Sequence, residues 1–200
     1  HDGTALLVDP GLFTTPEALD GVTGILITHE HPDHWTPEAL ALTDAPIWTI
    51  AAVADQIAAA SPAARERVTV VSPGDSFDAG VPVTAVGEKH AVIHPEFPQL
   101  FNTGYTVDLG GTVVHHPGDA FDLPGREVDV LLVPAGAPWM RASEAVDFAR
   151  TVRAPVNLGI HDRVYSDFAH GVFEKQMDAF LPAHGQRYVR LPDGADLQLS

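Results

Sequence analysis

The segment His29-Glu30-His31-Pro32-Asp33-His34 most constrains what this chain can fold into. Four side chains that can bind a metal ion fall within six residues, directly after the apolar run 25–27. Histidine and aspartate are costly to bury unless they are paired or bound to a metal. Alternate residues past a strand end point the same way, so His29 and His31 can converge on one ion. Asp33 and His34 follow in a turn and can point at a second ion; a histidine-rich surface loop is the alternative interpretation.

Composition limits the classes of protein to which the chain can belong. Its 200 residues, 45% of them hydrophobic, suit one domain spanning 1–200 with a substantial core. A formal charge of −16 argues against nucleic acid and against anionic membranes as partners. The absence of cysteine removes disulfides, thiolate metal sites and cysteine nucleophiles. We expect a small-molecule substrate, no nucleic-acid or membrane partner and, by default, a cytoplasmic location; the oligomeric state stays open.

The first three residues, His1-Asp2-Gly3, resemble the turn of a β-hairpin. The strand that would precede such a turn is absent from this sequence. We therefore expect that the natural N-terminus has been trimmed, in which case the first sheet would lack its first strand.

Hydrophobic periodicity and turn signals predict strands interleaved with helices. The expected strands are 4–8, 24–28, 47–50, 67–71, 76–78, 81–86, 104–109, 112–116, 128–133, 155–160 and 186–190. The expected helices are a short one through Leu42 capped by Thr36, then 51–60, 143–153 capped by Ser143, and 168–180, with a one-turn helix starting at 15–17. This order suits two sheets sandwiched between helices.

Three isolated residues, His90, Asp119 and His161, each follow the end of a predicted strand. Strand ends in layered α/β folds gather at one edge, where active sites also gather. Each residue also has a structural interpretation: Asp119 could cap a helix and His161 could be an exposed loop histidine. His94 competes with His90, and we prefer His90 because it lies closer to the strand end.

The pattern His29-x-His31-x-Asp33-His34, followed in order by His90, Asp119 and His161, resembles that of the metallo-β-lactamase-fold hydrolases. The resemblance covers nearly the whole chain, and segment 113–119 looks most like the branch that contains ascorbate-phosphate lactonase. It implies an α/β (α+β) fold, a four-layer αββα sandwich with a metal pair at one edge. By this resemblance His29, His31 and His90 would hold one metal, Asp33, His34 and His161 the other, and Asp119 would bridge them, since a carboxylate has two oxygens.

The implied cofactors are two divalent metal ions, with zinc expected and manganese or iron also suited to nitrogen and oxygen ligands. A hydroxide generated between the ions would cleave an ester, lactone, amide or phosphodiester bond of a small molecule. Asp33 would bind metal and orient the nucleophile or carry its proton. Two alternatives remain: a mononuclear-iron, oxygen-using enzyme of the persulfide dioxygenase type, and a non-catalytic metal-binding protein that keeps the fold.

Residues around the cluster have several candidate roles. Asp9 is a candidate acceptor for the free N–H of a ligand histidine, or the start of an Asp-Pro turn. His116 could contact substrate or act as an acid. Trp35, beside the cluster, is expected to line a pocket, with Phe97 and Trp139 as further pocket candidates. Arg163, two residues past His161, could meet an anion or lie on the surface.

Overall fold

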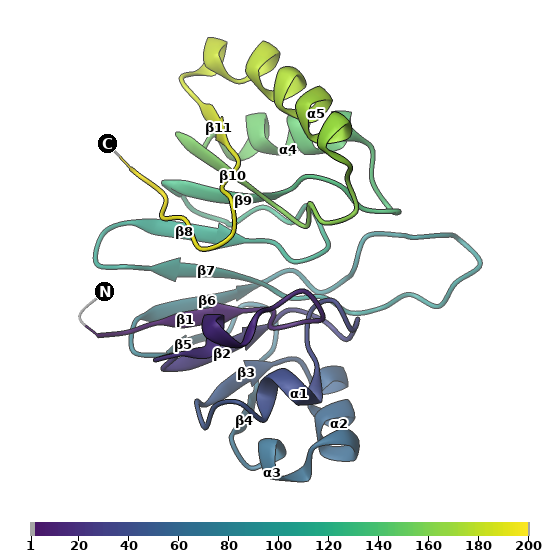
Figure 1. Ribbon diagram of the computed structural model, residues 1–200, viewed down its shortest axis with the longest axis vertical. Coiled ribbons are helices and arrows are strands. Elements are labelled where there is room, and N and C mark those ends of the chain that lie inside the picture. Colours follow the sequence, from purple (N-terminus) through teal and green to yellow (C-terminus); the bar gives the residue numbers. More distant parts are fainter. Residues whose placement is uncertain (1–2, 200) are drawn as a thin grey trace.

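The computed structural model describes residues 3–199 and arranges their strands in two sheets (Figure 1). The smaller sheet is wholly parallel, in the order β1 (Leu6–Val8), β2 (Gly24–Ile27), β3 (Ile47–Thr49), β4 (Val68–Val70). The larger has the order β11-β10-β9-β8-β7-β6-β5; β5 to β8 pair antiparallel and β8 to β11 parallel. Its strands are β5 (Ser76–Asp78), β6 (Pro82–Val86), β7 (Gly104–Asp108), β8 (Val113–His116), β9 (Val130–Pro134), β10 (Val156–Ile160) and β11 (Arg187–Val189).

Helices cover the outer face of each sheet. Figure 1 shows α1 (Pro37–Leu40), α2 (Ala51–Ala60) and α3 (Pro62–Arg65) at one end of the molecule, and α4 (Ala142–Val152) and α5 (Asp167–Phe180) at the other. Two short 3₁₀ helices complete the set, η1 (Pro16–Leu19) and η2 (Pro182–His184). None of the helices among the described residues has both the length and the apolar character needed to cross a membrane.

Three layers of apolar side chains separate these four layers of backbone. Strand β2 contributes to two of them: Ile25 and Ile27 pack with the helices of the smaller sheet, whereas Leu26 packs between the sheets with Tyr105. A strand buried on both faces has no polar alternation, which explains its continuous apolar sequence. The third layer, which includes Leu131, joins the larger sheet to α4 and α5. The predicted αββα sandwich is therefore confirmed.

Most predicted elements are present with ends shifted by one or two residues, and the main differences are local. The prediction that Ser143 caps the fourth helix is wrong, because the Glu144 carboxylate accepts the Arg141 N–H at 2.6 Å and the helix starts earlier. Residues 62–65, for which no element was predicted, form α3 with Pro62 at its first position. The predicted turn at the start of the chain includes His1 and Asp2, which lie outside the described residues.

The two sheets are joined by hydrogen bonds just behind the histidine segment. The buried Tyr105 hydroxyl donates to the Ile27 carbonyl at 2.9 Å, and the Thr103 N–H donates to the Thr28 carbonyl at 3.0 Å. Gly118, with φ of +64°, lies so close to this junction that a Cβ there would collide with the Asn102 side chain. The strand ends that carry the candidate site are thus held against one another by the backbone.

His115 on β8 is a buried histidine of this framework. Its Nε2–H donates to the Asp122 carbonyl and its Nδ1 accepts the Thr106 hydroxyl, both at 3.0 Å. Burial lowers the pKa of His115 to about 4. In the unfolded chain His115 has a pKa of about 6.5. Between this value and the folded pKa, the unfolded chain binds a proton at His115 and the folded chain does not, so the free energy of unfolding falls as pH falls.

We expect this residue to reduce the free energy of unfolding by about 3 kcal/mol between pH 7 and pH 4. Urea denaturation of the chelator-treated protein measures the effect, with His115→Gln as the comparison, since glutamine can keep both hydrogen bonds but does not titrate. The pH dependence should be shallower in the variant by about this amount. Parallel pH profiles for the two proteins would contradict the assignment.

Candidate metal centre

The histidine segment leaves the carboxyl end of β2 and turns back at once. His34 N donates to the His31 carbonyl at 3.0 Å, which closes the turn. His29 Nε2 and His31 Nδ1 lie 3.0 Å apart, so the two side chains converge as the alternation of residues predicts. His31 presents its Nδ1 to this point and His29 its Nε2.

The three isolated residues reach the same place from other strands. Asp119 follows β8, and its Oδ2 lies 3.4 Å from the Nε2 atoms of both His90 and His161. His161 follows β10 directly, and its Nε2 lies 3.2 Å from Asp33 Oδ2. The structure brings His90 into the cluster and leaves His94 exposed, with its Nδ1 accepting the Glu96 N–H at 3.2 Å.

The seven side chains form two adjoining groups. One contains His29, His31, His90 and Asp119; the other contains Asp33, His34 and His161. Within each group the candidate ligand atoms lie within 4.8 Å of one another. Asp119 also touches the second group, because its Oδ1 lies 3.3 Å from His34 Nε2. The two groups contain the same residues as the two ligand sets that the sequence resemblance implies, and their binding of metal stays a prediction.

The donor atoms of the cluster fit a metal site better than a hydrogen-bonded network. His34 Nε2, His90 Nε2, His161 Nε2 and Asp119 Oδ1 are buried, yet none has a hydrogen-bond partner among the described residues. Buried polar atoms are almost always satisfied. Ligand atoms at about 2.1 Å from a tetrahedral zinc ion lie roughly 3.4 Å from one another. Several ligand-atom pairs of the cluster lie 3.0 to 4.0 Å apart, and those within each group lie within 4.8 Å. The site thus has the spacing and the unpaired atoms that a cation requires.

Hydrogen bonds on the far side of the rings fix their orientation. His161 Nδ1–H donates to the Gly136 carbonyl at 2.8 Å, and His34 Nδ1 lies 2.7 Å from Asp9 Oδ2. His29 Nδ1 contacts the Thr28 hydroxyl at 3.0 Å. Each contact places the ring proton on Nδ1 and leaves the Nε2 lone pair facing the cluster.

The Asp9 carboxylate hydrogen-bonds to residues that orient the cluster. Its Oδ1 accepts the Thr28 N–H and its Oδ2 accepts the Thr28 hydroxyl, both at 2.7 Å, in addition to His34. Through Thr28 it also orients His29, so one carboxylate fixes a histidine of each group. Asp9 and His161 both have φ of +53°, a left-handed conformation that is strained for residues other than glycine and that concentrates at functional sites.

The charges in the cluster are strongly coupled. Burial opposes ionisation of Asp119, yet His90 and the neighbouring histidines outweigh it and hold the pKa of that carboxyl well below its usual range. Burial disfavours protonated His161, but Asp33 and Asp119 raise its pKa to about 9. Burial and the neighbouring His34 lower the pKa of His29 well below its ordinary value. Asp119 is therefore ionised and His29 neutral, the states in which each binds a cation, whereas His161 holds a proton that a cation would displace.

Two cavities open on either side of the cluster. The first, about 240 Å³, is lined by Asp33, His34 and His161 of the second group and by His116, Asp162 and Arg163. His116 Nδ1 accepts the Gly118 N–H at 3.0 Å, which leaves the proton on Nε2. The second cavity, about 260 Å³, adjoins His31 and His90 of the first group and is enclosed by the segment 91–100.

The surrounding aromatic residues differ from expectation. The prediction that Trp35 lines a pocket is wrong for both cavities: the indole packs in the core with Ile27 and Leu40, where its large apolar surface is buried. Phe97 lines the second cavity. Trp139 has a more direct role than lining a pocket, since its Nε1–H donates to Asp119 Oδ2 at 2.8 Å.

Sequence reasoning missed two supporting residues. Asn102 is fully buried, accepts the Asp119 N–H at 3.0 Å and donates to the Pro117 carbonyl at 2.9 Å. Thr28 links Asp9 to His29. The contacts of Asn102 with Asp119 and of Thr28 with Asp9 join residues 17 and 19 positions apart in the chain, and no local spacing signals them. Arg163, a candidate anion contact, pairs with the Asp193 carboxylate.

Comparison with known proteins gives consistent results. Residues 1–161 match the family described as a beta-lactamase superfamily domain. The chain is 42% identical over 179 residues to protein Rv0786c of Mycobacterium tuberculosis, covering 85% of this chain and 81% of that protein. It is 29% identical over 189 residues to the UPF0173 protein PF0020 of Pyrococcus furiosus, covering 88% and 83%.

Solved structures share the fold at lower identity. Igni18, a metallo hydrolase from Ignicoccus hospitalis, superposes with a TM-score of 0.73 at 19% identity, over 98% of this chain and 90% of that one. CmlA, a diiron β-hydroxylase from Streptomyces venezuelae, gives a TM-score of 0.70 at 16% identity, over 96% and 50%. The family match over residues 1–161 shows that the chain belongs to the β-lactamase superfamily, and the solved structures share its fold.

Proposed function

We propose that this protein is a hydrolase that uses two divalent metal ions to cleave an ester, lactone, amide or phosphodiester bond of a small molecule. The observation that carries the proposal is the convergence of seven histidine and aspartate side chains, from four separate strand ends, into two adjoining groups. The fold alone does not decide the activity, because unrelated chemistries share it. Igni18 is a metallo hydrolase and CmlA a diiron enzyme, which agrees with a metal-based function without identifying the reaction.

The positions of the residues assign each of them to one of the two metal ions. The group His29, His31, His90 would hold one ion, the group Asp33, His34, His161 the other, and Asp119 would join them. When bound, such a pair supplies a water that ionises near neutral pH and an electrophile for the substrate oxygen. Nitrogen and oxygen donors suit zinc, with manganese and iron as alternatives.

Asp33 is the member of the cluster best placed to move a proton. Its side chain is 32% exposed, compared with 4% for Asp119, and it lines the first cavity. From there it can accept the proton of the attacking water and pass it to the leaving group. His116 lines the same cavity, and burial lowers its pKa, so its neutral ring can donate from Nε2 to a substrate oxygen.

Trp139 would act through Asp119. Its indole N–H occupies one lone pair of Oδ2 and fixes the carboxylate relative to both groups. Partners of this kind orient a ligand without touching the metal, and their loss costs about 10- to 100-fold in metal affinity.

Metal content tests the proposal directly. Protein purified without chelators should carry close to two equivalents of divalent metal by mass spectrometry, and His31→Ala and Asp119→Ala should each lose at least one, because each removes a ligand. His94→Ala is the matched control, since this histidine lies outside the cluster and should leave the content unchanged.

Hydrolytic activity can be measured on the same preparation. Chelation should abolish hydrolysis of generic ester or phosphodiester substrates, and zinc or manganese should restore it. Full metal content in both variants would refute the assigned ligands. A single equivalent of iron in the unmodified protein would instead favour the mononuclear, oxygen-using alternative.

A second prediction concerns Trp139→Phe. Without the indole N–H, affinity for the more weakly bound equivalent of zinc should fall by about ten-fold, measured by competition with a chromophoric chelator. Trp35→Phe is the control, because its buried Nε1 has no hydrogen-bond partner to lose. Equal zinc affinities for the two variants would show that the contact with Asp119 plays no part in metal binding.

A further inference from the structure

The second cavity, here named the loop cavity, is attached to the candidate metal centre. His31 and His90 form one wall, and the segment 91–100 between β6 and β7 forms the rest, enclosing about 260 Å³. Figure 1 shows this connection projecting well beyond the edges of the sheets. A substrate held at His31 and His90 would therefore extend into the loop cavity.

The loop that encloses the cavity is held in place. His90 N donates to the Leu100 carbonyl at 3.0 Å, and Lys89 pairs with Phe101 in an antiparallel bridge. Ala91 N donates to the Asp119 carbonyl at 2.8 Å, which ties the loop to the residue shared by both groups. The cavity is thus preformed at a fixed position relative to the cluster, as ligand sites usually are.

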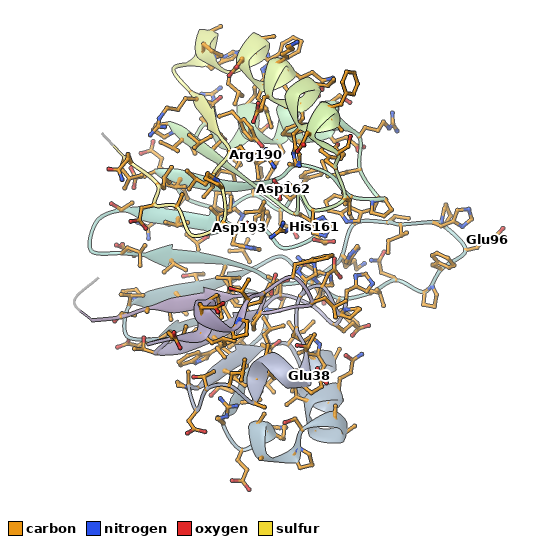
Figure 2. All side chains as sticks on the ribbon, in the orientation of Figure 1. Glu38, Glu96, His161, Asp162, Arg190 and Asp193 are labelled. Carbon is orange, nitrogen blue, oxygen red and sulfur yellow. The ribbon has the colours of Figure 1, made fainter. Side chains whose placement is uncertain are left out.

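Apart from its three histidines, the lining of the loop cavity contains only uncharged side chains. It consists of His31, His90, Ala91, Val92, Ile93, His94, Phe97, Pro98, Gln99 and Leu100. Gln99 Nε2 is already used, donating to the carbonyls of His90 and Leu100 at 2.7 and 3.0 Å. The acidic residue of this loop, Glu96, lies at the tip and points away from the body of the protein (Figure 2), and it does not line the cavity. Among the described residues, the lining contains no lysine or arginine that could pair with an anionic group placed here.

Three apolar side chains of this loop are exposed to solvent. Phe97 is 64% exposed, Val92 59% and Ile93 36%, in a chain with a formal charge of −16. Exposed apolar surface beside a cavity commonly marks a binding site. The first cavity also has apolar lining, from Val8, Phe13, Ile160 and Val164, but it adds the charged side chains of Asp9, Asp162 and Arg163. Of the two cavities, only the first therefore offers charged side chains outside the cluster to a polar substrate group.

We propose that the loop cavity binds an uncharged apolar group of the substrate, an alkyl or aryl chain, and that Ile93 and Phe97 determine its size. This inference rests on the proposed hydrolase function and narrows its substrate class. The bond that is cleaved would lie over the metal centre, with the apolar group in the loop cavity and the more polar part in the first cavity. Substrates with a charged group on the loop side would be poor, because burying that charge without a partner is costly.

Hydrolysis of 4-nitrophenyl acetate, butyrate and hexanoate by the zinc-loaded protein tests the inference. The ratio kcat/KM should rise about ten-fold from acetate to hexanoate. Phe97→Ala should remove most of that rise, mainly through KM, while the zinc content stays as in the unmodified protein. Phe168→Ala is the matched control: it removes an 82% exposed phenylalanine on α5 that lines neither cavity, and it should keep the full rise.

A binding experiment tests, independently of activity, whether the loop cavity binds an uncharged apolar group. Methyl resonances of Val92 and Ile93 should shift on titration with 1-hexanol and much less with hexyl phosphate, and the hexanol shifts should be lost in Phe97→Ala. Hexanol binding without cleavage of any ester would support the cavity and count against the hydrolase. Ester cleavage with no hexanol shifts, or with equal shifts in Phe97→Ala, would overturn the cavity assignment and leave the hydrolase standing.

Discussion

The buried carboxylate of Asp119 is the constraint on which the rest of this structure depends. It touches His34, His90 and His161, three side chains that belong to three different parts of the chain. Burial opposes its ionisation, which these histidines and His29 favour, and the indole N–H of Trp139 donates a hydrogen bond to it. A divalent cation on each side would satisfy the same carboxylate and the unpaired histidine nitrogens together.

The two sheets hold the residues around Asp119 in this arrangement. Parallel strands in both sheets deliver their carboxyl ends to one edge, and the hydrogen bonds of Tyr105 and Thr103 hold the sheets together directly behind it. The apolar layers then provide a rigid base, so that Asp9 and His161 can keep strained left-handed backbones. Stability resides in the layers, and the chemistry resides in the short segments that follow the strands.

Much of this could be predicted from the sequence because it is encoded locally. The apolar run 25–27 followed by the histidine segment identifies a buried strand and its end, and ligand-type residues after three further strands indicate a common edge. The choice between His90 and His94 needed the structure, since either could follow a strand. The same holds for Trp35, whose neighbours in sequence suggest a pocket whereas its surroundings in space are apolar.

Contacts between distant residues are what sequence patterns could not supply. Asn102 and Trp139 hold Asp119 from segments 17 and 20 residues away, and no periodicity marks them. The loop cavity likewise exists only because the segment 91–100 folds back toward His31. These contacts decide how the site is oriented and what it can accept, which explains why the fold was easier to predict than the substrate.

The most direct test of two cations between these seven side chains is anomalous scattering from crystals of the zinc-loaded protein. Data collected above and below the zinc absorption edge should show two peaks about 3.5–4 Å apart. One peak should lie within about 2.3 Å of donor atoms of His29, His31 and His90, and the other within the same range of donor atoms of Asp33, His34 and His161. A single peak, or peaks away from these side chains, would contradict the account.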